Sequence, residues 1–185
     1  LVQKFEGLLK NFFKCKHAIA VSNGSAALHL IGKILNWKKG DVVIVPPITF
    51  VSSVNSILHC NATPKFVDIN LENYCIDVNQ IENVLKYNKK IKAIVVTDYA
   101  GHPADWERLA WLKNKYNIKL VNDNCHAIGA SINNNLGYAC KYADLVSLSF
   151  HPVKNITTGE GGAILTNNKQ YFSKGKLLRS HGINR

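Results

Sequence analysis

Short apolar runs alternate with helical segments along this chain, and that alternation limits the folds open to it. Residues 42–45, 93–97, 145–150 and 163–166 are apolar through most of their length. A strand has this composition when both faces of its sheet are covered, whereas a half-exposed strand alternates apolar and polar residues. The sequence therefore predicts an α/β domain whose sheet is covered by helices on both faces.

Periodicity and turn residues place the other elements. Further strands are expected at residues 17–22, 65–68 and 120–121, and helices over 26–35, 50–58, 77–85, 104–116 and 169–179. An opening helix is expected to carry its apolar residues on one side: Val2, Phe5, Leu8, Leu9, Phe12 and Phe13. No repeat, linker or second domain boundary interrupts the pattern, so residues 1–185 are expected to form one domain.

Composition argues against several classes of protein. The five cysteines form no C-x-x-C pair and the seven histidines show no metal-ligand spacing, so we expect no disulfide framework and no metal site. No apolar run is long enough to cross a membrane. The net charge of +11 comes from scattered lysines, which favours a basic surface over a nucleic-acid interface. A reducing cytoplasm fits the cysteines best, and the absence of methionine suggests part of a longer chain.

Lys154 stands between an apolar strand and a loop rich in threonine and glycine, in Phe150-His-Pro-Val-Lys154. A lysine held there can lose hydration and act as an amine nucleophile toward an aldehyde. Asp123 ends another apolar strand about thirty residues earlier. A lysine that forms a Schiff base, together with a carboxylate for a pyridinium nitrogen, is the minimal signature of a pyridoxal phosphate enzyme. Either residue alone would indicate an ordinary surface lysine or a turn aspartate; the pair favours the enzyme.

Two further segments fit a phosphorylated cofactor. Asn23-Gly24-Ser25-Ala26 lies between a strand and a helix, where free amides bind phosphate without a cation; a simple helix cap at Ser25 is the alternative. Phe50 follows a strand end and either joins the core or offers a ring face to a planar cofactor. Cys125 lies close to Asp123 and is expected to be a small apolar filler rather than a nucleophile.

Taken together, these segments resemble the DegT/DnrJ/EryC/StrS family of pyridoxal phosphate-dependent sugar aminotransferases. The strings that carry the resemblance follow the family's order through nearly all of the chain: Ala20-Val-Ser-Asn-Gly-Ser-Ala-Ala-Leu28, Pro47-Ile-Thr-Phe50, Phe66-Val-Asp68, Asp98-Tyr-Ala-Gly101, Asp123-Asn-Cys-His-Ala-Ile-Gly129, Ser149-Phe-His-Pro-Val-Lys154, Gly159-Glu-Gly-Gly162 and Arg179-Ser-His-Gly182. The resemblance implies the large domain of the aspartate-aminotransferase fold, with a mixed, mainly parallel sheet. It also implies that an N-terminal segment and a C-terminal small domain are missing from residues 1–185.

The resemblance assigns roles to individual residues. Lys154 would bind pyridoxal phosphate covalently and carry protons, and Asp123 would keep the pyridine nitrogen protonated. Gly24, Ser25 and Ser149 would bind the phosphate. Phe50 would stack on the ring, and His126 would lie near its other face or its phenolic oxygen.

Three positions of this chain can be compared with the family pattern. Asn122 stands where many members carry Glu, and Ser25 where many carry Thr. Relatives with histidine at the lysine position are dehydratases, so Lys154 argues against that branch.

The string from Ser149 to Gly162 is similar to a subgroup that aminates C4 of UDP-linked 4-keto-6-deoxy sugars on the route to pseudaminic acid. The implied substrates are a UDP-linked keto-sugar and glutamate, and the implied assembly is a homodimer. Transamination in the synthesis of UDP-4-amino-4-deoxy-arabinose is a close alternative. A non-catalytic binding or regulatory module on the same fold is another, but such a module has no need of the Lys154–Asp123 pair.

Overall fold

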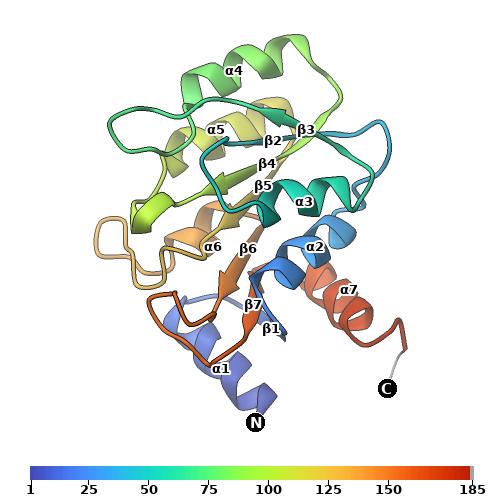
Figure 1. The fold of residues 1–185 in the computed structure, drawn as a ribbon, viewed down its shortest axis with the longest axis vertical. Helices are drawn as coiled ribbons and strands as arrows, with labels where there is room; N and C mark the ends of the chain where they lie inside the picture. The colour runs from blue at the N-terminus through green and yellow to red at the C-terminus, as the bar shows by residue number, and fades with distance from the viewer. Residues whose placement is uncertain (184–185) are drawn as a thin grey trace.

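Seven strands form one sheet in the order β1-β7-β6-β5-β4-β2-β3 in a computed structural model that describes residues 1–183 (Figure 1). The strands are β1 (His17–Val21), β2 (Val42–Val45), β3 (Thr63–Phe66), β4 (Ile91–Thr97), β5 (Lys119–Asp123), β6 (Leu145–Ser149) and β7 (Gly162–Thr166). Strands β3, β2, β4, β5 and β6 pair in parallel, and β7 pairs antiparallel with both β6 and β1. The mixed, mainly parallel sheet expected from the family resemblance is therefore confirmed.

The antiparallel strand β7 has a consequence for its neighbour β1. Because β7 reverses direction against both β6 and β1, the strand β1 runs parallel to the central strands. The carboxyl ends of β1, β2, β4, β5 and β6 therefore lie at the same edge of the sheet. In open α/β sheets that edge is where ligands bind.

Helices cover both faces of the sheet, as predicted from the apolar strands (Figure 1). The helices are α1 (Val2–Phe12), α2 (Gly24–Ile34), α3 (Ser52–Leu58), α4 (Val78–Tyr87), α5 (Trp106–Tyr116), α6 (Tyr138–Tyr142) and α7 (Lys169–Arg179), with a 3-10 turn η1 (Tyr99–Gly101). One apolar cluster packs α2 and α3 against one face; a second packs α1, α4, α5 and α6 against the other. All residues of β6 and β7 are buried.

Several predicted boundaries were wrong. Strand β3 begins at Thr63 and includes Pro64, which an edge strand tolerates because it needs no amide on its outer side. Helix α2 begins at Gly24, two residues earlier than expected. Helix α6 was not predicted, because five residues after Gly137 are too few to show a helical period.

The opening helix is present, but its apolar side is only partly buried. Leu9 and Phe13 are in the core, whereas Val2, Leu8 and Phe12 are exposed. The buried carboxylate of Glu6 accepts a hydrogen bond from the Ala20 amide (3.0 Å) and another from Arg179 Nη1 (2.8 Å). Helix α1 is thus tied to both β1 and α7 by polar contacts as well as by packing. Among residues 1–183, none of the helices is long and apolar enough to span a bilayer.

Candidate active site

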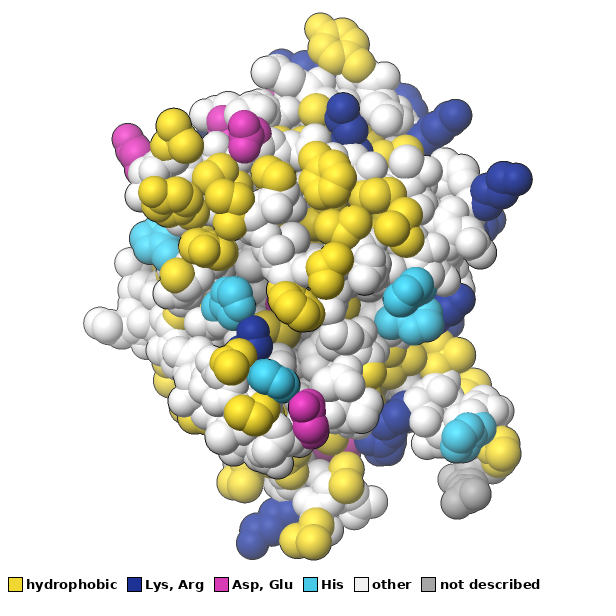
Figure 2. Space-filling model, in the orientation of Figure 1, with side chains coloured by type: hydrophobic (Ala, Val, Ile, Leu, Met, Phe, Trp, Pro, Cys, Tyr) yellow, Lys and Arg dark blue, Asp and Glu magenta, His cyan; other side chains and the backbone are white. Residues whose placement is uncertain are grey.

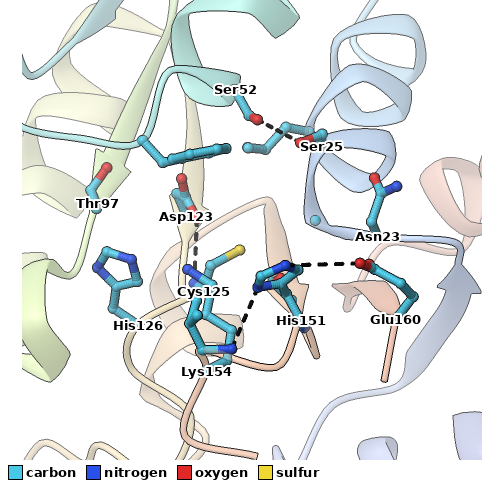
Figure 3. Close-up of a pocket in the computed structure, with 15 residues that line it drawn as sticks. Asn23, Ser25, Ser52, Thr97, Asp123, Cys125, His126, His151, Lys154 and Glu160 are labelled. Atoms are coloured by element: carbon cyan, nitrogen blue, oxygen red, sulfur yellow. Dashed lines mark hydrogen bonds and ion pairs between the residues drawn. The ribbon is translucent and has the colours of Figure 1, made fainter. Parts of the chain in front are cut away.

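The loops at the carboxyl ends of the parallel strands surround a pocket of about 450 Å³ (Figure 3). All seven residues named from the sequence line it: Gly24, Ser25, Phe50, Asp123, His126, Ser149 and Lys154. They come from four separate segments of the chain, and the fold brings together residues as far apart in the sequence as Gly24 and Lys154. A pocket of this size suits a small cofactor with part of a substrate.

Asp123 is the last residue of β5 and is almost fully buried. Its Oδ2 accepts a hydrogen bond of 2.6 Å from the Ser53 hydroxyl, and its Oδ1 accepts a longer one of 3.3 Å from the Cys125 amide. Figure 3 shows the carboxylate between His126 and the pair of serines Ser25 and Ser52. A buried carboxylate with few protein donors is suited to a cationic partner in the pocket.

Hydroxyl groups behind Asp123 form a chain that links three elements. Ser53 Oγ lies 3.1 Å from Thr49 Oγ1, which lies 2.8 Å from Thr97 Oγ1 at the end of β4. The chain fixes the loop after β2 against β4 and holds Ser53 where it meets Asp123. Ser53 is completely buried.

Lys154 is half-buried in the loop that follows β6. Its backbone amide donates to the His151 carbonyl (2.9 Å), which closes a turn. The Thr157 hydroxyl and the Thr158 amide donate to the Phe150 carbonyl, at 2.9 and 3.1 Å, and return the loop to the strand end. Lys154 is the one lysine among the pocket-lining residues in the described part of the chain.

The start of helix α2 forms another wall. Asn23 caps the helix, because its Oδ1 accepts from the Ala26 amide at 2.8 Å; the cap is therefore not Ser25. A Cβ at Gly24 would stand 2.9 Å from Ser149 Cβ, so only glycine lets the helix start approach the end of β6 this closely. The first amides of a helix have no carbonyl partner within the helix and are free for an anion.

Ser25 and Ser52 form a hydroxyl pair at one side of the pocket, with Oγ atoms 2.5 Å apart (Figure 3). Ser149 stays close to its own loop, where its Oγ accepts a long 3.5 Å bond from the His151 amide. These hydroxyls stand around the free amides of α2. The arrangement can receive a phosphate through amides and hydroxyls, without a second lysine or an arginine.

Two aromatic side chains, Phe50 and His126, line the pocket. Phe50 is 62% exposed, so it is not a core residue and leaves a ring face open to the pocket. Burial, followed by the charge of Lys154, lowers the pKa of His126 below its ordinary value, which favours the neutral imidazole. Both side chains line the pocket, where aromatic rings can contact a planar ring system.

Cys125 is not a nucleophile in this setting. Burial raises the pKa of its thiol well above the ordinary value, and the Asp123 charge raises it further. The thiolate is therefore disfavoured. The side chain fills the space beside Gly24, where a Cβ would come within 3.2 Å of its sulfur.

Six residues of the site were not found from the sequence: Asn23, Ser52, Ser53, Thr97, His151 and Glu160. Serines and threonines in loops carry no pattern that separates a site residue from a turn residue. His151 and Glu160 lie on opposite arms of the Lys154 loop, with Nε2 and Oε1 3.9 Å apart. The sequence offered one signal for these two residues, since a histidine and a glutamate stand in the same short loop as Lys154. Among residues 1–183, no group of three or more potential metal ligands is present.

The whole of residues 1–185 matches the model of the DegT/DnrJ/EryC1/StrS aminotransferase family. The chain belongs to this family. The resemblance seen in the sequence is therefore confirmed.

Named relatives agree with this assignment. The chain is 39% identical to UDP-4-amino-4,6-dideoxy-N-acetyl-beta-L-altrosamine transaminase of Campylobacter jejuni, over 98% of the chain and 48% of the relative. The structure matches that of Helicobacter pylori PseC, described as an aminotransferase involved in the biosynthesis of pseudoaminic acid, with a TM-score of 0.90 and 33% identity over 100% of the chain and 49% of PseC. It also matches NtdA of Bacillus subtilis, solved with bound cofactor PMP, with a TM-score of 0.87 and 31% identity over 95% of the chain and 39% of NtdA. The chain spans about half the length of the curated relatives it matches.

Proposed function

We propose that the protein is a pyridoxal phosphate-dependent aminotransferase that acts on a nucleotide-linked keto-sugar. One observation carries the proposal: Lys154 and Asp123 line the same pocket, next to the free amides at the start of α2. The family is one of aminotransferases, and a structural relative binds PMP, the amino form of the same cofactor.

The residues present fit this cofactor at four separate points. Asp123 offers a buried carboxylate that can face the pyridine nitrogen. The backbone at Gly24 and Ser25, with the Ser25 and Ser149 hydroxyls, can hold the phosphate. Phe50 and His126 can hold the two faces of the ring, and Lys154 is the amine to which the aldehyde can be attached.

When bound, pyridoxal phosphate supplies an aldehyde and an electron-accepting ring. The chain's own groups supply the rest. The Asp123 carboxylate keeps a proton on the ring nitrogen through a charge-assisted hydrogen bond. The Lys154 amine, when not engaged in holding the cofactor, is placed to move protons between the reacting carbons. His126 in its neutral form adds no positive charge to compete with that amine.

We propose C4 of a UDP-linked 4-keto-6-deoxy sugar as the amino acceptor, glutamate as the donor, and pseudaminic acid or another surface glycan as the pathway. The Campylobacter jejuni and Helicobacter pylori relatives support this choice. Synthesis of UDP-4-amino-4-deoxy-arabinose is the alternative activity. A non-catalytic binding module is the alternative class, and the presence of both Lys154 and Asp123 argues against it.

The proposal extends to the setting of the enzyme. Residues 1–185 correspond to the pyridoxal phosphate-binding large domain, and the full-length protein is a cytoplasmic homodimer with a second, smaller domain. The extent of the relatives supports the further domain, since each is about twice as long as this chain. Exposed hydrophobic side chains gather on the face shown in Figure 2, which is consistent with a subunit contact. Sedimentation of the full-length protein tests the dimer.

Two experiments test the function. The full-length protein is loaded with pyridoxal phosphate, reduced with borohydride and digested; a pyridoxyl label on Lys154 is expected, and a label on any other lysine would contradict the assignment. Products formed from UDP-4-keto-6-deoxy sugars and glutamate are then identified. Failure to form any amino-sugar, with the label in place on Lys154, would redirect the search to other keto-sugars.

A further inference from the structure

Asp98 lies directly behind Asp123, on the opposite face of the sheet. It follows β4 and is completely buried. Val95 and Val121 belong to the apolar cluster on the α2–α3 face, whereas Val96 and Leu120 belong to the cluster on the α4–α5 face. Since side chains alternate along a strand, Asp123 faces the pocket while Asn122 and Asp98 face away from it.

Five donors converge on the Asp98 carboxylate. Oδ1 accepts from the Ala104 amide (3.0 Å) and Trp106 Nε1 (2.9 Å), and Oδ2 accepts from Asn122 Nδ2 (3.0 Å), Asn124 Nδ2 (3.1 Å) and the Tyr138 hydroxyl (2.7 Å). Two of the donors, Asn122 and Asn124, are the residues on either side of Asp123. The Asp98 amide also donates to the Asp123 carbonyl, at 3.3 Å.

The donor and the acceptor of each hydrogen bond in this network can be assigned. Tyr138 accepts a hydrogen bond from Asn124 (3.0 Å), so its own proton is directed to Asp98. Burial raises the pKa of Asp98, but each of its five partners donates, and these donors favour the ionised carboxylate.

The same network orients both asparagine side chains. Their amide nitrogens point to Asp98, and their Oδ1 atoms are buried without a hydrogen-bond partner among residues 1–183. A buried acceptor without a partner costs free energy, so the attraction of Asp98 outweighs that cost at two positions.

We propose that Asp98 is a positioning residue, which holds the neighbours of Asp123 on both sides and so fixes the Asp123 carboxylate at the ring nitrogen of the cofactor. The inference rests on the proposed function. A carboxylate that must keep a proton on a ring nitrogen needs a fixed orientation, because a charge-assisted hydrogen bond weakens quickly as its geometry worsens. Asp98→Asn removes the negative charge, so the hydrogen bonds that hold Asn122 and Asn124 weaken from charge-assisted to neutral, and an amide group must face the donors at one of the two oxygen positions.

The test uses the visible absorption of pyridoxal phosphate bound to the full-length protein, titrated with pH. If Asp123 holds the ring proton less well, the ring loses positive charge, and the remaining proton on the cofactor is released at higher pH. Asp98→Asn is expected to raise the midpoint of the spectral transition by about 1 pH unit, with only a modest loss of cofactor affinity. An unchanged midpoint in a folded, cofactor-loaded Asp98→Asn would overturn the inference.

Two control variants separate positioning from stability. Trp106→Phe removes a donor to Oδ1 and leaves the asparagines held, so it is expected to lower the melting temperature without moving the midpoint. Asp105→Asn makes the same chemical change at an exposed helix cap beside the network and should also leave the midpoint in place. A midpoint that follows the melting temperature across all three variants would overturn the inference.

If Asp98→Asn does not fold, a variant of Asn122 provides a second test of the same inference. Asn122→Leu releases one of the two held side chains and leaves Asp98 intact. It is expected to raise the midpoint in the same direction by a smaller amount, and an unchanged midpoint would overturn the inference. If the wild-type protein shows no absorption band with pyridoxal phosphate, the proposed function itself fails, and the role of Asp98 fails with it.

Discussion

The buried Ser53 hydroxyl donates a 2.6 Å hydrogen bond to Asp123 Oδ2, across a sequence separation of 70 residues. Both side chains are buried, and Ser53 is held in turn by Thr49. The contact therefore orients the Asp123 carboxylate from the side of helix α3.

Ser53→Ala is expected to destabilise the protein by about 1.5–3 kcal/mol, because the buried carboxylate loses a charge-assisted hydrogen bond. Urea denaturation without cofactor measures this loss. Ser56→Ala is the matched control: Ser56 is also buried, but its hydroxyl donates to the neutral Ser53 carbonyl at 2.9 Å. It should cost about 0.5–1.5 kcal/mol. Equal losses in the two variants would show that the charge on Asp123 is unimportant to the contact.

Asp123→Asn is expected to bind pyridoxal phosphate and lose most of its transamination activity. The amide keeps the size of the side chain and can accept from Ser53, but it carries no negative charge to hold a ring proton. Loss of about 1.5–3 kcal/mol of stabilisation corresponds to a rate lower by roughly ten- to a hundredfold or more. Single-turnover kinetics of the full-length variant measure the rate, and near-normal turnover would refute the role of Asp123.

Gly24→Ala should weaken pyridoxal phosphate binding more than Ser25→Ala does. An added Cβ at Gly24 would press on Ser149 Cβ at 2.9 Å and push the helix start away from β6, at a cost of about 1–3 kcal/mol. Ser25→Ala removes one hydroxyl and leaves the amides in place. Fluorescence titration of the two variants with the cofactor gives the order. Wild-type affinity in both would place the phosphate elsewhere.

Local sequence patterns predicted most of the fold. Apolar runs identified strands such as β4 and β6 because both of their faces are buried, and such strands need no polar alternation. Boundaries failed where tertiary position outweighs local preference: Pro64 lies in β3 because that strand is at the sheet edge.

The site was predicted in part, for a physical reason. Lys154 and Asp123 were found because each stands at a strand end with an unusual neighbourhood. Ser53, Thr97 and Asp98 act through partners far away in the sequence. The pairing of β4 with β5 brings Asp98 to Asn122 and Asn124, whereas the segment after β2 brings its own hydroxyls to Thr97 and Asp123. No local pattern of residues encodes such a contact.

Acid should destabilise the protein through its partly buried histidines. Burial is the main cause that lowers the pKa of His126, His17 and His29 in the folded state. The unfolded chain then binds more protons than the folded one, so the free energy of unfolding falls as the pH drops through about 6.5 toward the folded values. Denaturation above and below that pH should show His126→Gln losing less stability in acid than the wild type. An identical loss in the two proteins would remove His126 as a contributor.

The last prediction concerns Gly162, the first residue of β7. It follows the Lys154 loop and lies against the backbone at the start of α2. A Cβ at this position would stand 2.3 Å from the Asn23 carbonyl carbon and 2.8 Å from the Gly24 amide nitrogen. Both atoms belong to the backbone, so no side chain can rotate out of the way. Gly162→Ala must therefore shift β7 or the turn that carries the free amides.

We expect Gly162→Ala to lose about 1–3 kcal/mol of stability and to bind pyridoxal phosphate more weakly than the wild type. Gly7→Ala is the control, because a Cβ at Gly7 meets nothing within 4 Å and alanine favours the helix. It should leave the affinity unchanged and keep or raise the stability. Thermal melts and cofactor titration of both variants measure the two effects. If Gly162→Ala lost stability but kept full affinity, the turn at Asn23 and Gly24 would not be part of the phosphate site.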